Sequence, residues 1–138
     1  MSAPNSLLVR AAKAQATERT PVWFMRQAGR YMPEYRAVRK QYSLIEICKR
    51  PEVAAQVTIE AAEILKVDAA IIFADLLLPA QAMGMQLDFV QGEGPAISNP
   101  VRDVQGLRQL KTVSDGELSY VAESVRIVCG ELNPPSCR

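Results

Sequence analysis

The chain has 138 residues, about half of them apolar, and no apolar run reaches the roughly 18 residues that a membrane-spanning helix requires. The net charge of +1 hides an asymmetry: residues 26–50 hold seven basic and two acidic residues, while residues 51–138 hold six basic and twelve acidic ones, a balance that argues against nucleic-acid binding. Histidine is absent and Cys48, Cys129 and Cys137 form no C-x-x-C pair, so the sequence predicts no zinc site and is typical of a cytoplasmic protein with reduced thiols.

The first predicted elements are a helix over residues 6–16 and a short strand over Val22–Met25. The helix pattern places Leu7 and Leu8 on one face. Residues 1–17 also hold basic residues without an acid, a composition that transit peptides share. Length and pattern favour the ordinary helix over that alternative.

A loop and a helix are predicted next. Gly29 and Pro33 interrupt regular structure, so residues 26–32 are expected to form a loop. Proline fits the first turn of a helix, where its missing N–H leaves no bond unmade. We therefore expect a helix over residues 34–40.

Two more helices are predicted before the next strand. Ser43 and Glu46 form a capping-box pattern, in which each side chain accepts a hydrogen bond from the other residue's backbone N–H. From Pro51 to Lys66, apolar residues recur at helical spacing, which makes this the clearest helix of the sequence. Ala69–Phe73 is short and apolar and contains β-branched residues, so it predicts a buried strand.

The part that follows is expected to be less regular. A short helix is predicted over residues 76–83, ended by Gly84. Apolar and polar residues alternate over residues 85–89, which predicts a half-buried strand. Two Gly and two Pro make residues 91–100 a predicted loop.

Helices close the predicted series. A helical turn is expected over residues 104–110, and Ser114 with Glu117 forms a second capping-box pattern that opens a helix to about Leu132. Residues 132–138 are expected to be an unstructured tail because two prolines block a helix there. The order of elements indicates an α/β fold in one domain over residues 1–131.

Asp75 follows the predicted strand at the end where barrels and open α/β sheets place their catalytic groups. Ile71, Ile72, Leu76 and Leu77 would surround it with apolar side chains and partly desolvate its carboxylate. Aspartate is equally favoured as a helix N-cap or a turn residue. From this residue alone, both interpretations stay open.

Arg26 and Arg30 bracket a flexible glycine directly after an apolar run. Guanidinium groups bind carboxylates as two-pronged forks. Gly29 lets the backbone approach a ligand or adopt a positive φ, and the N–H groups of Gln27 and Ala28 can then face an anion. The alternative is an exposed loop whose arginines pair with nearby glutamates.

The helix after this loop carries further cationic residues. Arg36, Arg39 and Lys40 recur at helical spacing, and Tyr35 shares a face with Arg39. We interpret Arg36 and Lys40 as solvated surface.

Two stretches, Met25-Arg-Gln-Ala-Gly-Arg-Tyr31 and the strand ending at Asp75 with Pro79 and Gln81-Ala-Met-Gly-Met85 after it, closely resemble the N-terminal region of uroporphyrinogen decarboxylases. Gly92-Glu-Gly-Pro95 also fits, and the resemblance runs from about residue 7 to residue 131. It implies the N-terminal part of a (β/α)8 barrel of the TIM type, incomplete in this chain. It also implies an enzyme of haem and chlorophyll synthesis that converts the four acetate side chains of uroporphyrinogen III to methyl groups, giving coproporphyrinogen. Such an enzyme is cytoplasmic, uses no metal or organic cofactor, and can form a homodimer.

By this resemblance, a set of residues from both stretches would line the substrate pocket: Arg26, Gln27, Ala28, Gly29, Arg30, Tyr35, Arg39 and Asp75. Asp75 is the implied catalytic residue and would reach the pyrrole N–H groups at the centre of the macrocycle. Arg39 would add a contact to a substrate carboxylate. An arginine beside the departing carboxylate could orient it or deliver a proton, and both roles stay open.

The chain also departs from the family, which is more than twice as long and adds a Tyr, a Ser and a His to the pocket. We therefore expect a truncated or frame-shifted product whose residues 132–138 are foreign to the family. The alternative function is an inert fragment that at most binds an anionic ligand or a partner subunit. Corrinoid and thiol methyltransferases share the fold, but they need a His/Cys zinc site that this sequence does not offer.

Overall fold

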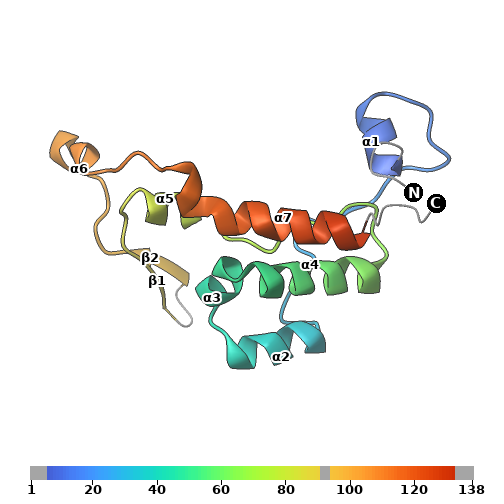
Figure 1. Ribbon diagram of the computed structural model, residues 1–138, viewed down its shortest axis with the longest axis horizontal. Helices are drawn as coiled ribbons and strands as arrows, with labels where there is room; N and C mark the ends of the chain where they lie inside the picture. Colours follow the sequence, from blue (N-terminus) through green and yellow to red (C-terminus); the bar gives the residue numbers. More distant parts are fainter. Residues whose placement is uncertain (1–5, 91–93, 133–138) are drawn as a thin grey trace. The chain divides into compact units, whose positions relative to one another are not determined.

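The computed structural model describes residues 6–90 and 94–132, which divide into two units. Unit 1 contains the chain up to Phe73 and returns from Tyr120 onward, and unit 2 is Ala74–Ser119. Figure 1 follows the elements along the chain. Within the described ranges, no helix is both long and apolar enough to cross a membrane.

Unit 1 begins with the short helix α1 (Leu7–Ala12). Ser6 caps it, because its Oγ accepts a hydrogen bond from the Val9 N–H at 3.3 Å. The helix ends before the expected boundary at residue 16. Ala14 has a positive φ of 53°, a backbone conformation that cannot continue an α-helix.

Three predicted helices of unit 1 are confirmed: α2 (Pro33–Gln41), α3 (Leu44–Lys49) and α4 (Pro51–Leu65). Proline occupies the first turn of both α2 and α4, as expected. The capping box of α3 is formed, with Glu46 N–H donating to Ser43 Oγ at 3.2 Å and Ser43 N–H donating to the Glu46 carboxylate at 2.7 Å. The second of these bonds holds the pKa of Glu46 below its usual value.

The core of unit 1 forms where α2 and α3 pack against α4. Its buried apolar side chains are Met32, Tyr35, Val38, Ile47, Val57 and Ala61. Each large aliphatic side chain buried in this way contributes about 1.5–3 kcal/mol. Cys48 is 2% exposed and is a small residue of this core.

The two strands predicted for unit 1 are wrong, because neither Val22–Met25 nor Ala69–Phe73 forms a strand. The backbone hydrogen bond near them runs from Asp68 N–H, one residue before the second segment, to Val22 O at 2.8 Å. A parallel ladder needs evenly repeated bonds of this kind. The burial expected for Ala69–Phe73 is incomplete, because Ile71 is 38% exposed while Phe73 packs against the core. The four side chains of Val22–Met25 are 44–78% exposed.

The helix predicted from Ser114 to Leu132 forms in two parts. The first turn is the 3₁₀ helix η2 (Asp115–Leu118), and α7 (Ser119–Leu132) continues from it. The Glu117 carboxylate accepts a hydrogen bond from Ser114 N–H at 2.8 Å, as the capping-box pattern predicts. In α7, Ser124 and Val128 are buried. The tail predicted over residues 132–138 lies, from residue 133 onward, outside the described residues.

Unit 2 contains short elements. Helix α5 (Leu78–Ala82) is followed by Gly84 at a φ of +100°, which confirms the predicted glycine stop. The predicted strand at residues 85–89 is present as β1 (Leu87–Val90). Helix α6 (Val104–Arg108) is also present, and Asp103 caps it by accepting from Gly106 N–H at 2.7 Å.

The loop predicted over residues 91–100 is wrong in part, because it contains the strand β2 (Gly94–Ile97). This strand pairs antiparallel with β1, with Leu87 opposite Ile97 and Phe89 opposite Pro95. Proline is tolerated because the strands of a two-stranded ribbon each have an edge that needs no donor. Helices and strands together agree with the predicted α/β character.

Candidate functional site

The loop that carries Arg26 and Arg30 is closed by hydrogen bonds of its own. Met32 N–H donates to Gly29 O at 2.9 Å, and Tyr31 Oη donates to Gln27 O. Both arginine side chains are exposed. The loop predicted over residues 26–32 is therefore confirmed, and it presents two guanidinium groups to solvent.

Gln27 joins this loop to residues of unit 1 that are distant in sequence. Its side chain is 3% exposed, and its Nε2 donates to Ala69 O at 2.6 Å. Ile71 N–H donates to its Oε1 at 3.0 Å. The carboxamide therefore makes the pair of bonds that a neighbouring strand would make with residues 69–71.

Arg36 gives the loop a second support. Its Nη1 donates to Arg30 O at 2.9 Å and to Tyr31 O at 3.2 Å. The interpretation of Arg36 as solvated surface is therefore wrong in one respect. The side chain is exposed, but it also holds the loop by donating to two of the loop's backbone carbonyl groups. Lys40 is exposed, as expected.

Gly29 is needed for space. Positive φ values occur at other described glycines, Gly84 and Gly94, and not at Gly29. A Cβ on Gly29 would lie 3.0 Å from Tyr31 Cε1 and 3.1 Å from Tyr31 Cδ1. The glycine therefore lets the Tyr31 ring lie against the loop backbone, while Ala28 packs against the core.

Tyr35 and Arg39 lie on the helix that follows. Tyr35 is 8% exposed and its ring centre is 5.4 Å from that of Phe73, with the rings tilted by 49°. Burial raises the pKa of the Tyr35 phenol. Arg39 is exposed and donates from Nη1 to Tyr42 O at 2.7 Å. Tyr35 therefore packs in the core next to the loop, whereas Arg39 lies on the exposed face of α2.

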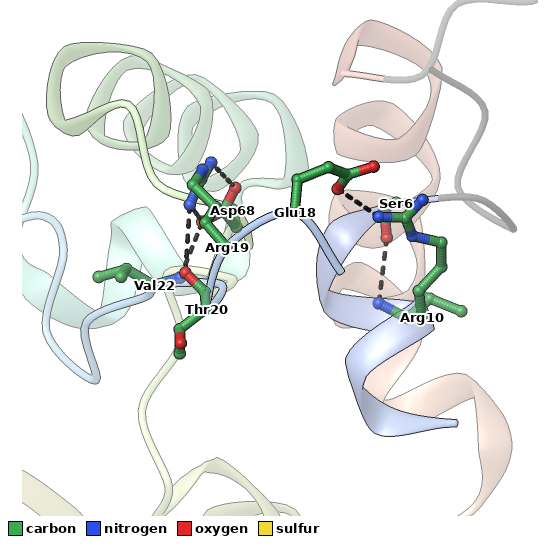
Figure 2. A network of polar contacts seen from close by, with 8 residues as sticks. Ser6, Arg10, Glu18, Arg19, Thr20, Val22 and Asp68 are labelled. Carbon is green, nitrogen blue, oxygen red and sulfur yellow. Dashed lines mark hydrogen bonds and ion pairs between the residues drawn. The ribbon is translucent and has the colours of Figure 1, made fainter. Parts of the chain in front are cut away.

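Sequence reasoning missed the ion pair that joins the chain before this loop to Asp68. Arg19 forms a two-pronged contact with Asp68, at 2.6 Å for both N–O pairs, and Val22 N–H donates to the same carboxylate at 2.7 Å. Figure 2 shows the three groups converging, while the adjacent Glu18 points the other way, to Arg10. The Arg19 guanidinium and then the Val22 N–H hold the pKa of Asp68 below its usual value.

Thr58 of α4 is a further support that the sequence did not reveal. It is 1% exposed, its hydroxyl donates to Ala54 O at 2.7 Å, and it accepts from Phe73 N–H at 2.9 Å. The segment before Asp75 is therefore fixed to α4 through a buried hydroxyl. A buried Thr in an apolar helix face was the one available signal.

Asp75 lies in unit 2 and forms a turn. Its Oδ1 accepts from Leu77 N–H at 2.8 Å, and its carbonyl accepts from Leu78 N–H at 3.3 Å. Asp75 is therefore a turn residue, and its catalytic role stays a prediction. Among the described residues, Oδ2 accepts no hydrogen bond. Leu76 is 97% exposed, so the apolar enclosure expected around the half-buried carboxylate is wrong on that side.

The described residues contain no group of three or more Cys, Asp or Glu side chains arranged to hold a metal ion. The predicted charged residues lie in different units: the arginines of the loop belong to unit 1 and Asp75 belongs to unit 2. In unit 1, the exposed guanidinium groups of Arg26 and Arg30 fit an anionic ligand.

Comparison with known proteins identifies the family of the chain. The family model of uroporphyrinogen decarboxylase (URO-D) matches residues 3–136. The chain belongs to the uroporphyrinogen decarboxylase family. The family takes its name from a decarboxylase, that is, a carboxy-lyase. The match reaches residue 136, beyond the boundary predicted at residue 131.

Several curated relatives bear the name uroporphyrinogen decarboxylase. The protein of Koribacter versatilis is 65% identical over 93% of this chain, and that of Solibacter usitatus is 51% identical over 90%. The protein of Thermus thermophilus is 47% identical over 98% of the chain. The chain spans 36% of the length of the first two relatives and 40% of the third.

Proposed function

We propose that this chain supplies the substrate-binding loop and the catalytic carboxylate of an enzyme that converts uroporphyrinogen III to coproporphyrinogen. The observation that carries the proposal is the exposed Arg26–Arg30 loop in a chain 65% identical to a protein named uroporphyrinogen decarboxylase. The proposed fold of the active enzyme is the TIM-type barrel that this resemblance implies, and its proposed location is the cytoplasm.

In this proposal the loop binds the carboxylates of the tetrapyrrole. Arg26 and Arg30 supply two guanidinium forks, and the backbone of Gln27, Ala28 and Gly29 lies between them. Arginine binds carboxylates through paired hydrogen bonds that lysine cannot reproduce. The proposed pocket also includes Tyr35 as an apolar wall and Arg39 as a further carboxylate contact.

Asp75 is the proposed catalytic residue. A proton adds to a pyrrole carbon next to an acetate side chain and makes the ring a cation. The C–C bond to the carboxylate then breaks, CO₂ leaves, and the bonding electron pair neutralises the ring. Protonation of the remaining methylene carbon gives a methyl group, and loss of the proton first added to the ring carbon restores the neutral pyrrole. The ionised Asp75 carboxylate, beside the pyrrole N–H groups, stabilises the cation more than the neutral substrate and so lowers the barrier.

The test is an anaerobic incubation of the purified chain with uroporphyrinogen III, followed by separation of products by their carboxylate number. Products with seven to four carboxylates support the proposal. The matched sample joins this chain to the remaining sequence of the Koribacter versatilis relative, because the chain spans 36% of that protein. Absence of turnover in both samples contradicts the proposal.

Binding without turnover is the second candidate function. The exposure of Val22, Trp23, Phe24 and Met25 favours it, since a catalytic barrel needs the side chains of its strands to be packed. In that case the chain binds uroporphyrinogen or a partner subunit but forms no coproporphyrinogen. Turnover by the 138-residue chain alone excludes this candidate.

A further inference from the structure

The bonds of Gln27 point to a role that differs from ligand contact. Both polar groups of its carboxamide are occupied, Nε2 by Ala69 O at 2.6 Å and Oε1 by Ile71 N–H at 3.0 Å. The side chain is 3% exposed. A group that is buried and bonded at both ends has little capacity left for a substrate carboxylate.

We propose that Gln27 is a positioning residue, whose side chain fixes the Arg26–Arg30 loop to the main chain of residues 69–71 and does not itself bind the ligand. The geometry resembles the pairing of one residue in a parallel sheet: the side-chain donor and acceptor of Gln27 take the place of the backbone N–H and C=O of a neighbouring strand. Among the described residues, the strands lie elsewhere, at β1 and β2, so residues 69–71 have no paired strand beside them.

Further hydrogen bonds lie on both sides of the Gln27 contact. On the loop side, the Gln27 carbonyl accepts from Tyr31 Oη, so the same residue also closes the loop. On the other side, Phe73 N–H is held by Thr58 at 2.9 Å. Hydrogen bonds therefore hold residues 69–73 at both ends. Because Gln27 makes the bonds at one end, its side chain also holds the loop that carries Arg26 and Arg30 in place against this segment.

The anchor is also distinct from the ion pair nearby. Arg19 and Asp68 join the chain before the loop to the residue before Ala69, at 2.6 Å. That contact is charged and exposed on the Arg19 side, whose side chain is 59% exposed. Gln27 is neutral and buried, so its effect on the loop should not depend on salt concentration. The contribution of the ion pair should weaken as salt is added.

The first test measures hydrogen–deuterium exchange in the ligand-free chain. In the wild-type protein, the Ile71 amide should exchange at least about tenfold more slowly than the Ala70 amide, since only the former donates to Gln27. Equal exchange at the two amides overturns the proposal without any variant. This measurement is independent of the proposed function.

The second test uses Gln27→Met, which keeps the length of the side chain and removes both hydrogen bonds. Exchange at Ile71 and in residues 26–32 should rise about tenfold, while α4 stays protected. The matched control is Gln56→Met, because Gln56 bonds Glu60 at 2.8 Å on an exposed helix face and should leave the loop unchanged. Unchanged loop exchange overturns the proposal, and so does an equal rise in α4, which would make Gln27 a general stability residue.

The last test rests on the proposed function and separates positioning from contact. Titration with uroporphyrinogen III should show binding weakened about fivefold or more by Gln27→Met and by Arg26→Met. Only the first variant should also speed exchange at Ile71 in the ligand-free chain. If wild type does not bind, the proposed function fails while the exchange result stands. If Gln27→Met binds as wild type does, the positioning role is overturned.

Discussion

Arg19 and Asp68 form an ion pair in which two guanidinium nitrogens each meet one carboxylate oxygen at 2.6 Å. The same carboxylate accepts from Val22 N–H at 2.7 Å. The Asp68 side chain is 13% exposed. Three donors on a largely covered carboxylate make this contact the main link between residues 19–22 and residue 68.

The ion pair predicts how stability depends on pH. The pKa of Asp68 is lowered in the folded chain, chiefly by Arg19, so the ionised form favours folding. This contribution is present above the unfolded pKa of about 3.9 and is lost as pH falls through the lower folded pKa. Asp68→Asn should therefore reduce stability at pH 7, and the difference from wild type should shrink toward pH 2. Thermal unfolding from pH 2 to pH 7 measures this.

The control for that experiment is Glu123→Gln, which removes an ion pair with Arg126 within one helix. Exposed pairs of this kind contribute little, so stability should change little at any pH. A constant difference between Asp68→Asn and wild type across the whole range would contradict the ion-pair explanation.

Thr58 provides a prediction on buried hydrogen bonding. Thr58→Val keeps the shape but leaves Phe73 N–H without its acceptor, which should cost about 1–3 kcal/mol of unfolding free energy. Thr58→Ser keeps the hydroxyl and loses one methyl, and it should cost less, about 1 kcal/mol. Urea unfolding followed by circular dichroism compares the two. A larger loss in Thr58→Ser would show that packing, not the hydroxyl, matters at this position.

The elements that could be predicted are those whose cause is local. Ser43 with Glu46, and Pro33 at the start of α2, set their helices through residues within one turn. Gly84 likewise ended a helix where a positive φ was needed. Helix caps and turns depend on residues that are neighbours in the sequence, so they can be predicted from it.

The elements that could not be predicted depend on distant partners. Val22–Met25 and Ala69–Phe73 have strand-like sequences, but a strand also needs a neighbour along its length. The backbone bond near them comes from Asp68, just before the second segment, to Val22 O. The candidate site follows the same division. Its residues were recognisable from the motif, whereas the supports from Gln27 and Asp68 act across 42 or more residues. No local pattern marks such a contact.

Arg26 and Arg30 should be sensitive to loss of the guanidinium fork. Replacing either with Lys keeps the charge, and binding of uroporphyrinogen III should weaken about tenfold. Arg108→Lys is the control, because Arg108 is an exposed residue of α6. Titration calorimetry measures the affinities of wild type and the three variants. Equal affinities in all variants would make the loop ordinary surface.

Arg36→Lys should give an intermediate result. Arg36 donates to Arg30 O and Tyr31 O, so the variant loses support for the loop while keeping its charge. Binding should weaken by less than in Arg30→Lys but by more than in Arg108→Lys. An effect no larger than that of Arg108→Lys would return Arg36 to the solvated surface.

Asp75→Asn tests the catalytic proposal. Asparagine keeps the Oδ1 acceptor that receives Leu77 N–H at 2.8 Å, so the turn should persist. It removes the charge needed for a cationic transition state, and turnover should fall by about 10²–10³ with little change in substrate affinity. The measurement uses the chain joined to the remaining sequence of the Koribacter versatilis relative. Near-normal turnover would remove Asp75 from the mechanism.

Gly29→Ala tests whether the glycine is required for space. The new Cβ would lie 3.0 Å from the Tyr31 ring, closer than carbon atoms normally approach, and the glycine φ is not in the positive region. The ring must therefore move, which breaks the bond from Tyr31 Oη to Gln27 O. Stability should fall by about 1 kcal/mol, and exchange in residues 26–32 should rise.

The double variant Gly29→Ala/Tyr31→Ala separates this explanation from backbone strain. Tyr31→Ala removes the ring, so adding a methyl at Gly29 should then cost almost nothing, and the two substitutions should be strongly non-additive. If the cause were instead a conformation open only to glycine, the cost of Gly29→Ala would be the same with and without the ring. Urea unfolding of the four proteins gives the coupling free energy, and a value near zero would contradict the steric explanation. Because Tyr31 is 60% exposed, its removal leaves no large cavity to obscure the comparison.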